Sequence, residues 1–208
     1  EKLFEISRAV LRDKSLRKEV IMKSTNIYNM VLIAIMAAVL CVISPFSLPI
    51  GPVPISLATL AIYVIIFILG WKKSTISVLV FLAIGLAGVP VFTGFSGGVG
   101  KAFGPTGGYL VGYLLLTIVA GLLIEKFEGK YYMYVIGLVL GTICLYALGT
   151  VWLAYQAGMS FYAALGAGVI PFIPGDIAKI VVACIIGPVI AKQIKKLQPE
   201  TTKTLENQ

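Results

Sequence analysis

The chain has no histidine, few acidic residues and little charge of either sign. Its 208 residues include 9 Asp and Glu against 17 Lys and Arg, and only 12% are charged. The lack of histidine excludes Ser-His-Asp triads, Cys-His pairs and histidine metal sites, and with them most hydrolytic chemistry. A soluble domain carries about twice this charge fraction. We therefore expect neither an enzyme nor an ordinary soluble fold.

Cysteine is also scarce, and the few present are poorly placed for metal binding. Cys41, Cys144 and Cys184 each lie inside an apolar run, without a CxxC spacing. This pattern indicates neither a disulfide framework nor a zinc site. The run from Gly98 to Ala102 resembles a phosphate-binding loop, but it lacks the Ser or Thr that this motif requires at position 102.

Long apolar runs separated by short loops fill most of the chain, of which 59% is hydrophobic. Six of them are near the about 20 residues needed to cross the hydrocarbon core. They cover residues 28–44, 55–71, 75–90, 105–124, 131–156 and 174–194. We expect an all-α integral membrane protein with six transmembrane helices, forming one membrane domain over residues 28–195.

The distribution of Lys and Arg predicts that both termini are cytoplasmic. Basic residues gather in the amino-terminal segment, in the loops after the second and fourth spans, and in the tail. The alternate loops, 45–54, 91–104 and 157–173, contain only Lys101. Basic loops remain on the cytoplasmic side, which accounts for the net charge of +8 without nucleic acid. A multi-pass protein of a prokaryotic cell membrane is expected.

The two ends of the chain differ from the apolar middle. Residues 1–27 form a basic amphipathic cytoplasmic segment, and residues 1–21 have the composition of a helix lying on an anionic leaflet. Met22 is equally compatible with a natural start, which would make the preceding residues an extension. Residues 196–208 form a polar tail.

Asp176 and Lys179 stand at the start of the last apolar run, where charge is costly. Every other acid lies outside the predicted spans, and ionisable groups in membrane spans are functional candidates that need a partner. Residues three apart share one face of a helix, so the two charges can neutralise each other. The pair either fixes the end of this helix, where its N-terminus favours an acid, or lines a pocket.

Three unusual segments gather on the predicted outer side. Loop 45–54 is rich in proline, loop 91–104 alternates glycine with Phe92 and Phe95, and a turn with Pro171 and Pro174 opens the Asp176 helix. Prolines and glycines also make ordinary tight turns. Their convergence beside a buried acid nevertheless favours a pocket for a small ligand with N–H donors and a carboxylate.

Several blocks of the sequence form a recognisable set: Gly51-Pro-Val-Pro54, Gly88-Val-Pro-Val-Phe92, Gly97-Gly98, Gly104-Pro-Thr-Gly-Gly-Tyr-Leu110, Tyr146-Ala-Leu-Gly149, Trp152 and Pro171-Phe-Ile-Pro-Gly-Asp-Ile-Ala-Lys179. Together they resemble the BioY family, the biotin-binding S-components of energy-coupling factor (ECF) vitamin transporters. One departure is Ser56-Leu-Ala-Thr59, where relatives often have Thr-x-Gln-Thr. Ala58 cannot supply the amide of that glutamine.

The resemblance implies a six-helix subunit that takes biotin from outside, with biotin as transported ligand and no cofactor. Asp176 would accept from the ureido N–H groups, while Lys179 balances that charge or reaches a ligand oxygen. Further hydrogen bonds would come from Thr106, Tyr109 and the Gly97-Gly98 backbone, and ring contacts from Phe92 and Trp152.

The resemblance also implies protein partners. A transmembrane coupling subunit would dock on Ala34 and Ala38 of the first helix, where small residues allow close approach. Two cytoplasmic ATPases would drive it. Two other classes remain open from the residues alone. One is an ion-coupled secondary carrier or channel, and the other is a nontransporting assembly factor in which the charge pair is a structural clamp.

Overall fold

The computed structural model describes residues 14–48, 55–127 and 129–197, which form a bundle of helices. The long helices are α2 (Lys14–Ile43), α3 (Ala58–Leu86), α5 (Gly107–Lys126), α6 (Tyr131–Ala157) and α8 (Ile173–Leu197). Short elements connect them: β1 (Ser47–Leu48), β2 (Ile55–Ser56), α4 (Val99–Ala102), α7 (Phe161–Gly168) and the 3₁₀ turn η1 (Ile170–Phe172). The strands pair antiparallel, with Ser47 opposite Ser56.

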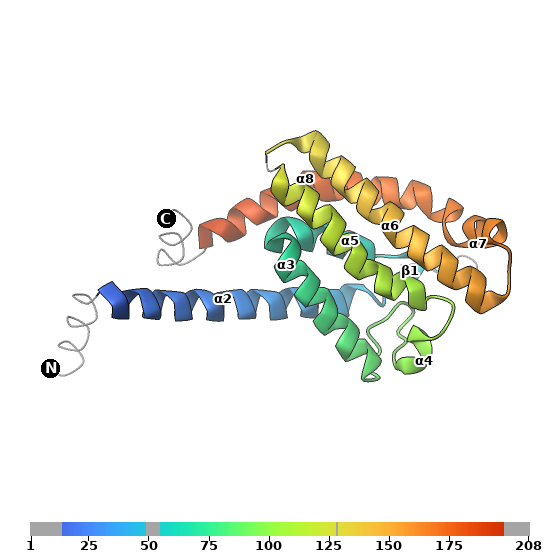
Figure 1. The fold of residues 1–208 in the computed structure, drawn as a ribbon, viewed down its shortest axis with the longest axis horizontal. Helices are drawn as coiled ribbons and strands as arrows, with labels where there is room; N and C mark the ends of the chain where they lie inside the picture. The colour runs from blue at the N-terminus through green and yellow to red at the C-terminus, as the bar shows by residue number, and fades with distance from the viewer. Residues whose placement is uncertain (1–13, 49–54, 128, 198–208) are drawn as a thin grey trace.

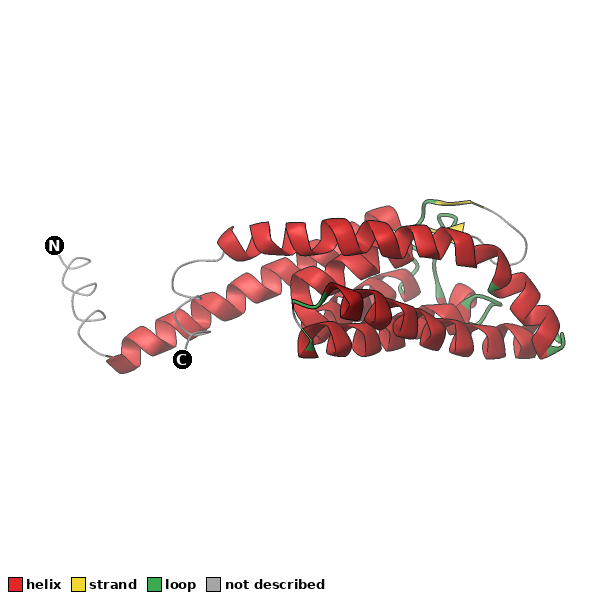
Figure 2. Cartoon of the chain, turned by 90° about the horizontal axis from the view of Figure 1, so that it is seen from above, coloured by secondary structure: helices red, strands yellow, loops and turns green. Residues whose placement is uncertain are grey.

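The first helix, α2, continues without a break from Lys14 to Ile43. The predicted boundary at residue 27 is therefore not a break in the helix, and its first turns project beyond the bundle (Figures 1 and 2). Of the amphipathic helix expected over residues 1–21, residues 1–13 lie outside the described part, as do residues 198–208 of the tail and residues 49–54 of the first outer loop.

Helix α3 bends sharply instead of giving way to a loop. Gly70 has φ 70° and ψ 176°, which divides the element into two helical halves that run in different directions (Figure 1). Only glycine adopts this conformation at little cost. The two spans predicted over 55–71 and 75–90 are thus joined at Gly70, and the second ends at Leu86. A loop was expected at 72–74, where the chain is helical.

The core is built where α5 lies between α3 and α6. Residues with little or no side chain let the helices meet closely: a Cβ at Gly121 would lie 2.6 Å from Trp71 Cβ, and one at Gly112 would lie 2.8 Å from Leu145 Cδ1. Leu116 and Phe81 are fully buried in this core. The chain then turns after Gly158, which is left-handed at the end of α6, and Ser160 caps α7 by accepting from Ala163 N.

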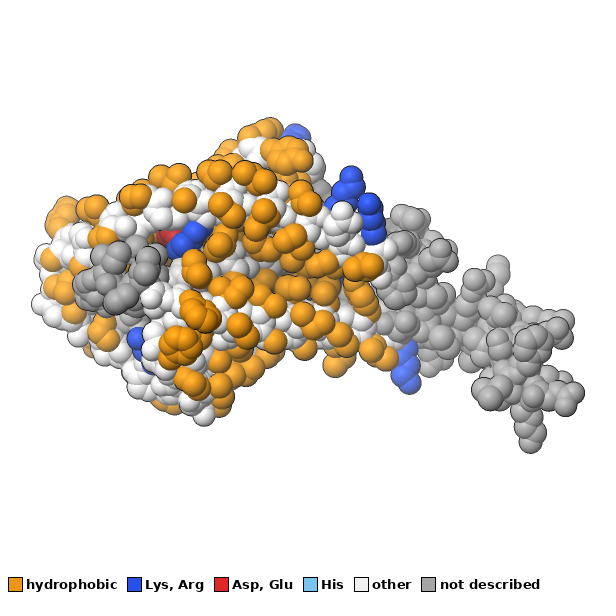
Figure 3. All heavy atoms as spheres, turned by 180° about the vertical axis from the view of Figure 1, so that it is seen from behind, with side chains coloured by type: hydrophobic (Ala, Val, Ile, Leu, Met, Phe, Trp, Pro, Cys, Tyr) orange, Lys and Arg blue, Asp and Glu red, His pale blue; other side chains and the backbone are white. Residues whose placement is uncertain are grey.

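Within the described part of the chain, five helical segments are long and apolar enough to cross a membrane. They are Thr25–Ile43, Ala58–Leu86, Gly107–Lys126, Tyr131–Ala157 and Phe161–Leu197. Hydrophobic side chains cover the middle of the surface in Figure 3, with several blue Lys and Arg side chains toward the right of the view and a few elsewhere, one of them next to the red acid. A surface of this kind is suited to lipid rather than water. The protein is a helical multi-pass membrane protein.

The molecule has two distinct ends. The start of α2, the bend at Gly70 and the end of α8 lie at one end, which we call the basic end (Figure 1). Lysines concentrate there: Lys23, Lys72, Lys73, Lys126, Lys130, Lys192, Lys195 and Lys196. β1, α4 and α7 lie at the opposite end, which we call the loop end (Figure 1).

Candidate functional site

A buried ion pair lies at the loop end, in the first two turns of α8. Lys179 Nζ is 2.8 Å from Asp176 Oδ1, and the two side chains are only 11% and 9% exposed. The predicted pairing at i and i+3 is confirmed. Pro174 and Gly175 precede Asp176 in the sequence, so the acid sits in the first turn, where the helix N-terminus favours negative charge.

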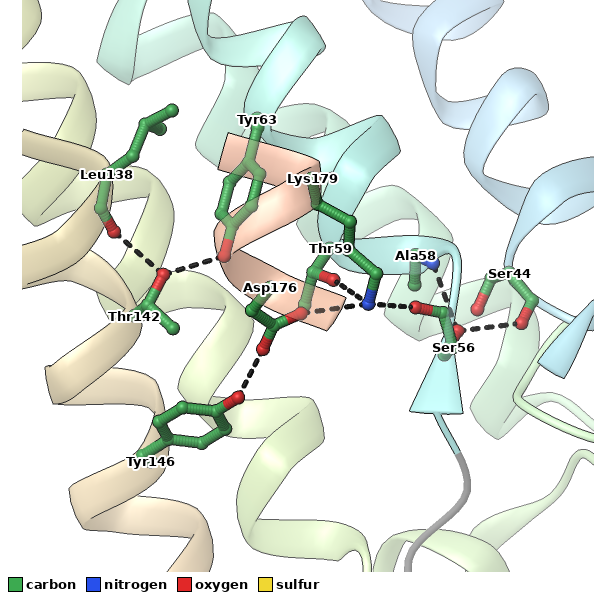
Figure 4. Close-up of polar contacts among 10 residues, drawn as sticks. All are labelled: Ser44, Ser56, Ala58, Thr59, Tyr63, Leu138, Thr142, Tyr146, Asp176 and Lys179. Carbon is green, nitrogen blue, oxygen red and sulfur yellow. Dashed lines mark hydrogen bonds and ion pairs between the residues drawn. The ribbon is translucent and has the colours of Figure 1, made fainter. Parts of the chain in front are cut away.

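Lys179 also ties α8 to the start of α3. Its Nζ donates to Ser56 O at 2.8 Å and to Thr59 Oγ1 at 3.1 Å, besides Asp176 (Figure 4). An ammonium group has three hydrogens to donate. All three have partners within the protein, so Lys179 is fully occupied as a charge-balancing and tethering group.

The other carboxylate oxygen of Asp176 accepts from the hydroxyl of Tyr146 on α6. One turn earlier on α6, Thr142 shares a 2.7 Å hydrogen bond with Tyr63 and donates to Leu138 O (Figure 4). Polar groups buried among apolar helices need such partners. Hydrogen bonds thus connect α8 to α6 and α3 to α6, with one charged acceptor, Asp176, in the middle.

A pocket of about 590 Å³, including its open mouth, surrounds this pair. It is lined by Ser56, Thr59, Phe92, Thr93, Lys101, Thr106, Tyr109, Leu110, Tyr113, Leu145, Tyr146, Gly168, Phe172, Asp176 and Lys179. We call it the acid pocket. Apolar and aromatic walls with a few convergent polar groups suit a ligand that is partly apolar and partly hydrogen-bonding.

Five of the eight site residues predicted from the sequence line the acid pocket: Asp176, Lys179, Tyr109, Thr106 and Phe92. Tyr109 donates to Gly168 O at 3.0 Å. Thr106 Oγ1 is buried without a hydrogen-bond partner. Because buried hydroxyl groups are normally paired, this atom is a candidate to receive a hydrogen bond from a bound molecule.

The other three predicted residues, Gly97, Gly98 and Trp152, do not line the pocket. Gly98 N donates to Gly85 O at 2.7 Å. A Cβ at Gly97 would lie 2.3 Å from Val89 O. The two glycines therefore let loop 88–98 fold closely on itself, and their backbone serves this loop.

Trp152 holds the entry of α5 in place. Its Nε1 donates to Gly104 O at 2.9 Å, and a Cβ at Gly108 would lie 2.3 Å from Trp152 Cβ. Glycine at this position is required for that close approach. The Gly-Pro-Thr-Gly-Gly-Tyr block thus positions Thr106 and Tyr109 by packing against Trp152, which is a supporting residue outside the pocket lining.

Sequence reasoning missed Tyr146 and Lys101 as pocket residues. Tyr146 belongs to a block that was used only for the resemblance, and its contact with Asp176 spans 30 residues of sequence. Thr142 and Tyr146 are polar residues four apart on an apolar helix, so they share one face, and this pattern could have indicated a polar site on that face. For Lys101 the signal was its isolation as the one basic residue in the predicted outer loops.

The chain is similar to known proteins of one family. A family model described as the BioY family matches residues 16–196. The chain belongs to the BioY family. It is 37% identical over 166 residues to a biotin transporter BioY of Thermotoga maritima, covering 80% of this chain and 95% of the relative. With biotin transporter BioY2 of Lactococcus lactis, identity is 33%, covering 80% of this chain and 91% of that protein.

A solved structure supports the same BioY assignment. The crystal structure of an S-component for biotin from an ECF-type ABC transporter superposes with a TM-score of 0.75 at 31% sequence identity. The match covers 81% of this chain and 93% of that one. The expected all-helical membrane fold is therefore confirmed over most of the chain.

Proposed function

We propose that this BioY protein captures biotin from the outer side and serves as the substrate-specific subunit of an ECF-type vitamin transporter. One observation carries the proposal: a buried Asp176–Lys179 pair lines a pocket with aromatic and hydrogen-bonding walls in a chain whose relatives are named biotin transporters. The subunit binds and releases its ligand unchanged. It is not an enzyme, and biotin is its cargo and not a cofactor.

We infer six membrane crossings with both termini cytoplasmic. The bend at Gly70 supports the count, because 29 residues of straight helix would span about 43 Å at 1.5 Å per residue, well beyond the about 30 Å of the hydrocarbon core. The concentration of lysines at the basic end supports the orientation. The acid pocket then opens to the outside of the cell membrane.

Asp176 is the proposed acceptor for the ureido N–H groups of biotin. A carboxylate has about four lone-pair sites, and within the protein each of its oxygens accepts one hydrogen bond. Capacity remains for a donor from the ligand. Lys179 balances the charge without touching biotin, because its three hydrogens are already used.

The remaining contacts follow from the pocket lining. Thr106 and Tyr109 supply hydroxyl groups, while Phe92 faces the apolar ring. Lys101 also lines the pocket and has no carboxylate within ion-pair distance among the described residues. We assign it to the valerate carboxylate. The Gly97-Gly98 backbone and Trp152 shape the loop and the α5 entry around the ligand.

The coupling subunit is proposed to dock on the outward face of α2. Ala34 and Ala38 are exposed, whereas Ala37 packs inside at 2% exposure. Small exposed side chains four apart permit another helix to approach closely. Two cytoplasmic ATPases would supply the energy through that subunit. The remaining outer surface of the helices would contact membrane lipid.

Uptake of labelled biotin by cells lacking their own biotin transport tests this function. We expect uptake when the chain is produced with the coupling and ATPase subunits, and its loss when the ATPases are inactive. Asp176→Asn should strongly reduce uptake at low biotin concentration with all subunits present. Equal uptake by the chain alone and with inactive ATPases would instead indicate an ion-coupled carrier or a channel.

A further inference from the structure

A second cavity lies at the basic end and takes no part in the proposed biotin site. It encloses about 1460 Å³, including its opening. Parts of α2, α3, α5, α6 and α8 line it. Its walls combine apolar side chains, such as Leu32, Phe67 and Ile194, with several lysines. We call it the lysine cavity.

The charges in the lysine cavity are predominantly positive. Lys72, Lys73, Lys192 and Lys195 line it, and Glu125 is the one acid among the lining residues. No carboxylate lies within ion-pair distance of Lys72, Lys73 or Lys192 among the residues that the structure describes. Lys73 donates to the neutral Asn29 Oδ1 at 2.8 Å. The local positive charge is therefore left unneutralised by these neighbours.

Two features of the backbone bring the lysines together. The bend at Gly70 reverses α3 immediately before Lys72 and Lys73. Lys192 and Lys195 are three residues apart in the last turns of α8, so they share one face.

We propose that the lysine cavity binds the phosphate headgroup of an anionic phospholipid from the cytoplasmic leaflet. The proposal rests on the orientation inferred above, which places the basic end at that leaflet. Basic pockets between membrane helices on the cytoplasmic side bind anionic headgroups. Apolar walls beneath the lysines suit the glycerol and upper acyl chains, which a free phosphate or an acidic peptide lacks.

The test measures lipid binding to the purified full chain in neutral detergent, by native mass spectrometry with phosphatidylglycerol and with phosphatidylcholine. We compare the wild type with Lys72→Gln/Lys192→Gln. The matched control is Lys126→Gln/Lys130→Gln, which removes the same charge at the same end, where both lysines lie over the Phe127 ring and neither lines the cavity.

We expect phosphatidylglycerol to bind the wild type in preference to phosphatidylcholine. The cavity double variant should weaken phosphatidylglycerol binding roughly 20-fold, since each basic residue near an anionic surface contributes roughly a factor of five. The control should change binding by less than about twofold. A second variant, Ile194→Trp, fills the cavity without altering charge and should also reduce lipid binding.

Three results would overturn the proposal. An equal loss of phosphatidylglycerol binding in the two double variants would indicate a general attraction of the lipid to the basic surface. Displacement of the lipid by equimolar inorganic phosphate would indicate a simple anion site. Unchanged lipid binding with lost assembly onto the coupling subunit would assign the lysines to that partner. Biotin binding measured on the same samples keeps these failures distinct from a failure of the proposed transport function.

Discussion

The acid pocket and the lysine cavity lie at opposite ends of one bundle and differ in how far their charges are balanced by neighbours of opposite sign. In the acid pocket, Asp176 and Lys179 neutralise each other at 2.8 Å. In the lysine cavity, four lysines face a single acid. A neutral, hydrogen-bonded interior suits a ligand recognised by its N–H groups and shape, whereas uncompensated positive charge attracts anions.

This difference in charge balance also explains why the side chains of the acid pocket must be held in place, whereas those of the lysine cavity need not be. Lys179 holds α8 to α3 through Ser56 and Thr59, and Tyr146 holds it to α6. Desolvated charges persist only when such partners are fixed in place. The lysines at the basic end lie near water, so they can move toward a headgroup without that cost.

Lys179→Met should have the largest effect, because it leaves the Asp176 carboxylate buried without its cation. Removing one partner of a buried ion pair costs about 3–5 kcal/mol. We expect the free energy of unfolding in detergent to fall by that amount, and Asp176→Asn in the same chain should restore part of it. Lys192→Met is the control at the lysine cavity, with a change within about 0.5 kcal/mol. Equal stability of the Lys179→Met and Lys192→Met variants would contradict the proposed difference between the two sites.

Tyr146→Phe should have the next largest effect, on biotin affinity. The variant removes the hydrogen bond to Asp176 Oδ2 that orients the proposed acceptor, and a loss of about 1 kcal/mol corresponds to roughly fivefold weaker binding. Calorimetric titration with biotin measures it. Tyr134→Phe, which removes the acceptor of Gly129 N beside the lysine cavity, should leave affinity unchanged. A similar loss in both variants would place the effect in general packing.

Thr106→Val should have a smaller and more specific effect. Thr106 Oγ1 is buried without a partner, so its loss costs the free protein nothing in hydrogen bonding. We expect biotin affinity to fall roughly twofold to threefold, with thermal stability unchanged. Thr117→Val alters a buried threonine of α5 that does not line the pocket, and should not alter affinity. Unaltered affinity in Thr106→Val would remove Thr106 from the site.

The sequence predicts the local features of the acid pocket well. The helical spacing of Asp176 and Lys179 is sufficient to predict their pairing, and the structure confirms it. Contacts between distant segments were not predictable in this way. The hydrogen bond from Tyr146 depends on how α6 is rotated against α8, which no local pattern specifies.

Two differences between prediction and structure have simple physical causes. Trp152 was expected to pack against the rings of biotin, but it is not among the residues that line the pocket, and its indole N–H donates to Gly104 O. A loop was expected at 72–74 because of two lysines. The chain instead reverses at Gly70, since one glycine with positive φ is enough for the turn.

The most direct test of the central claim compares the acids of the two sites. Biotin affinity should be measured by calorimetry for the wild type, Asp176→Asn and Glu125→Gln, the latter altering the acid of the lysine cavity. A charge-assisted hydrogen bond is worth about 1.5–3 kcal/mol. Asp176→Asn should therefore bind biotin roughly 10- to 100-fold more weakly, and Glu125→Gln should bind as the wild type does. Wild-type affinity in a folded Asp176→Asn protein would contradict the account.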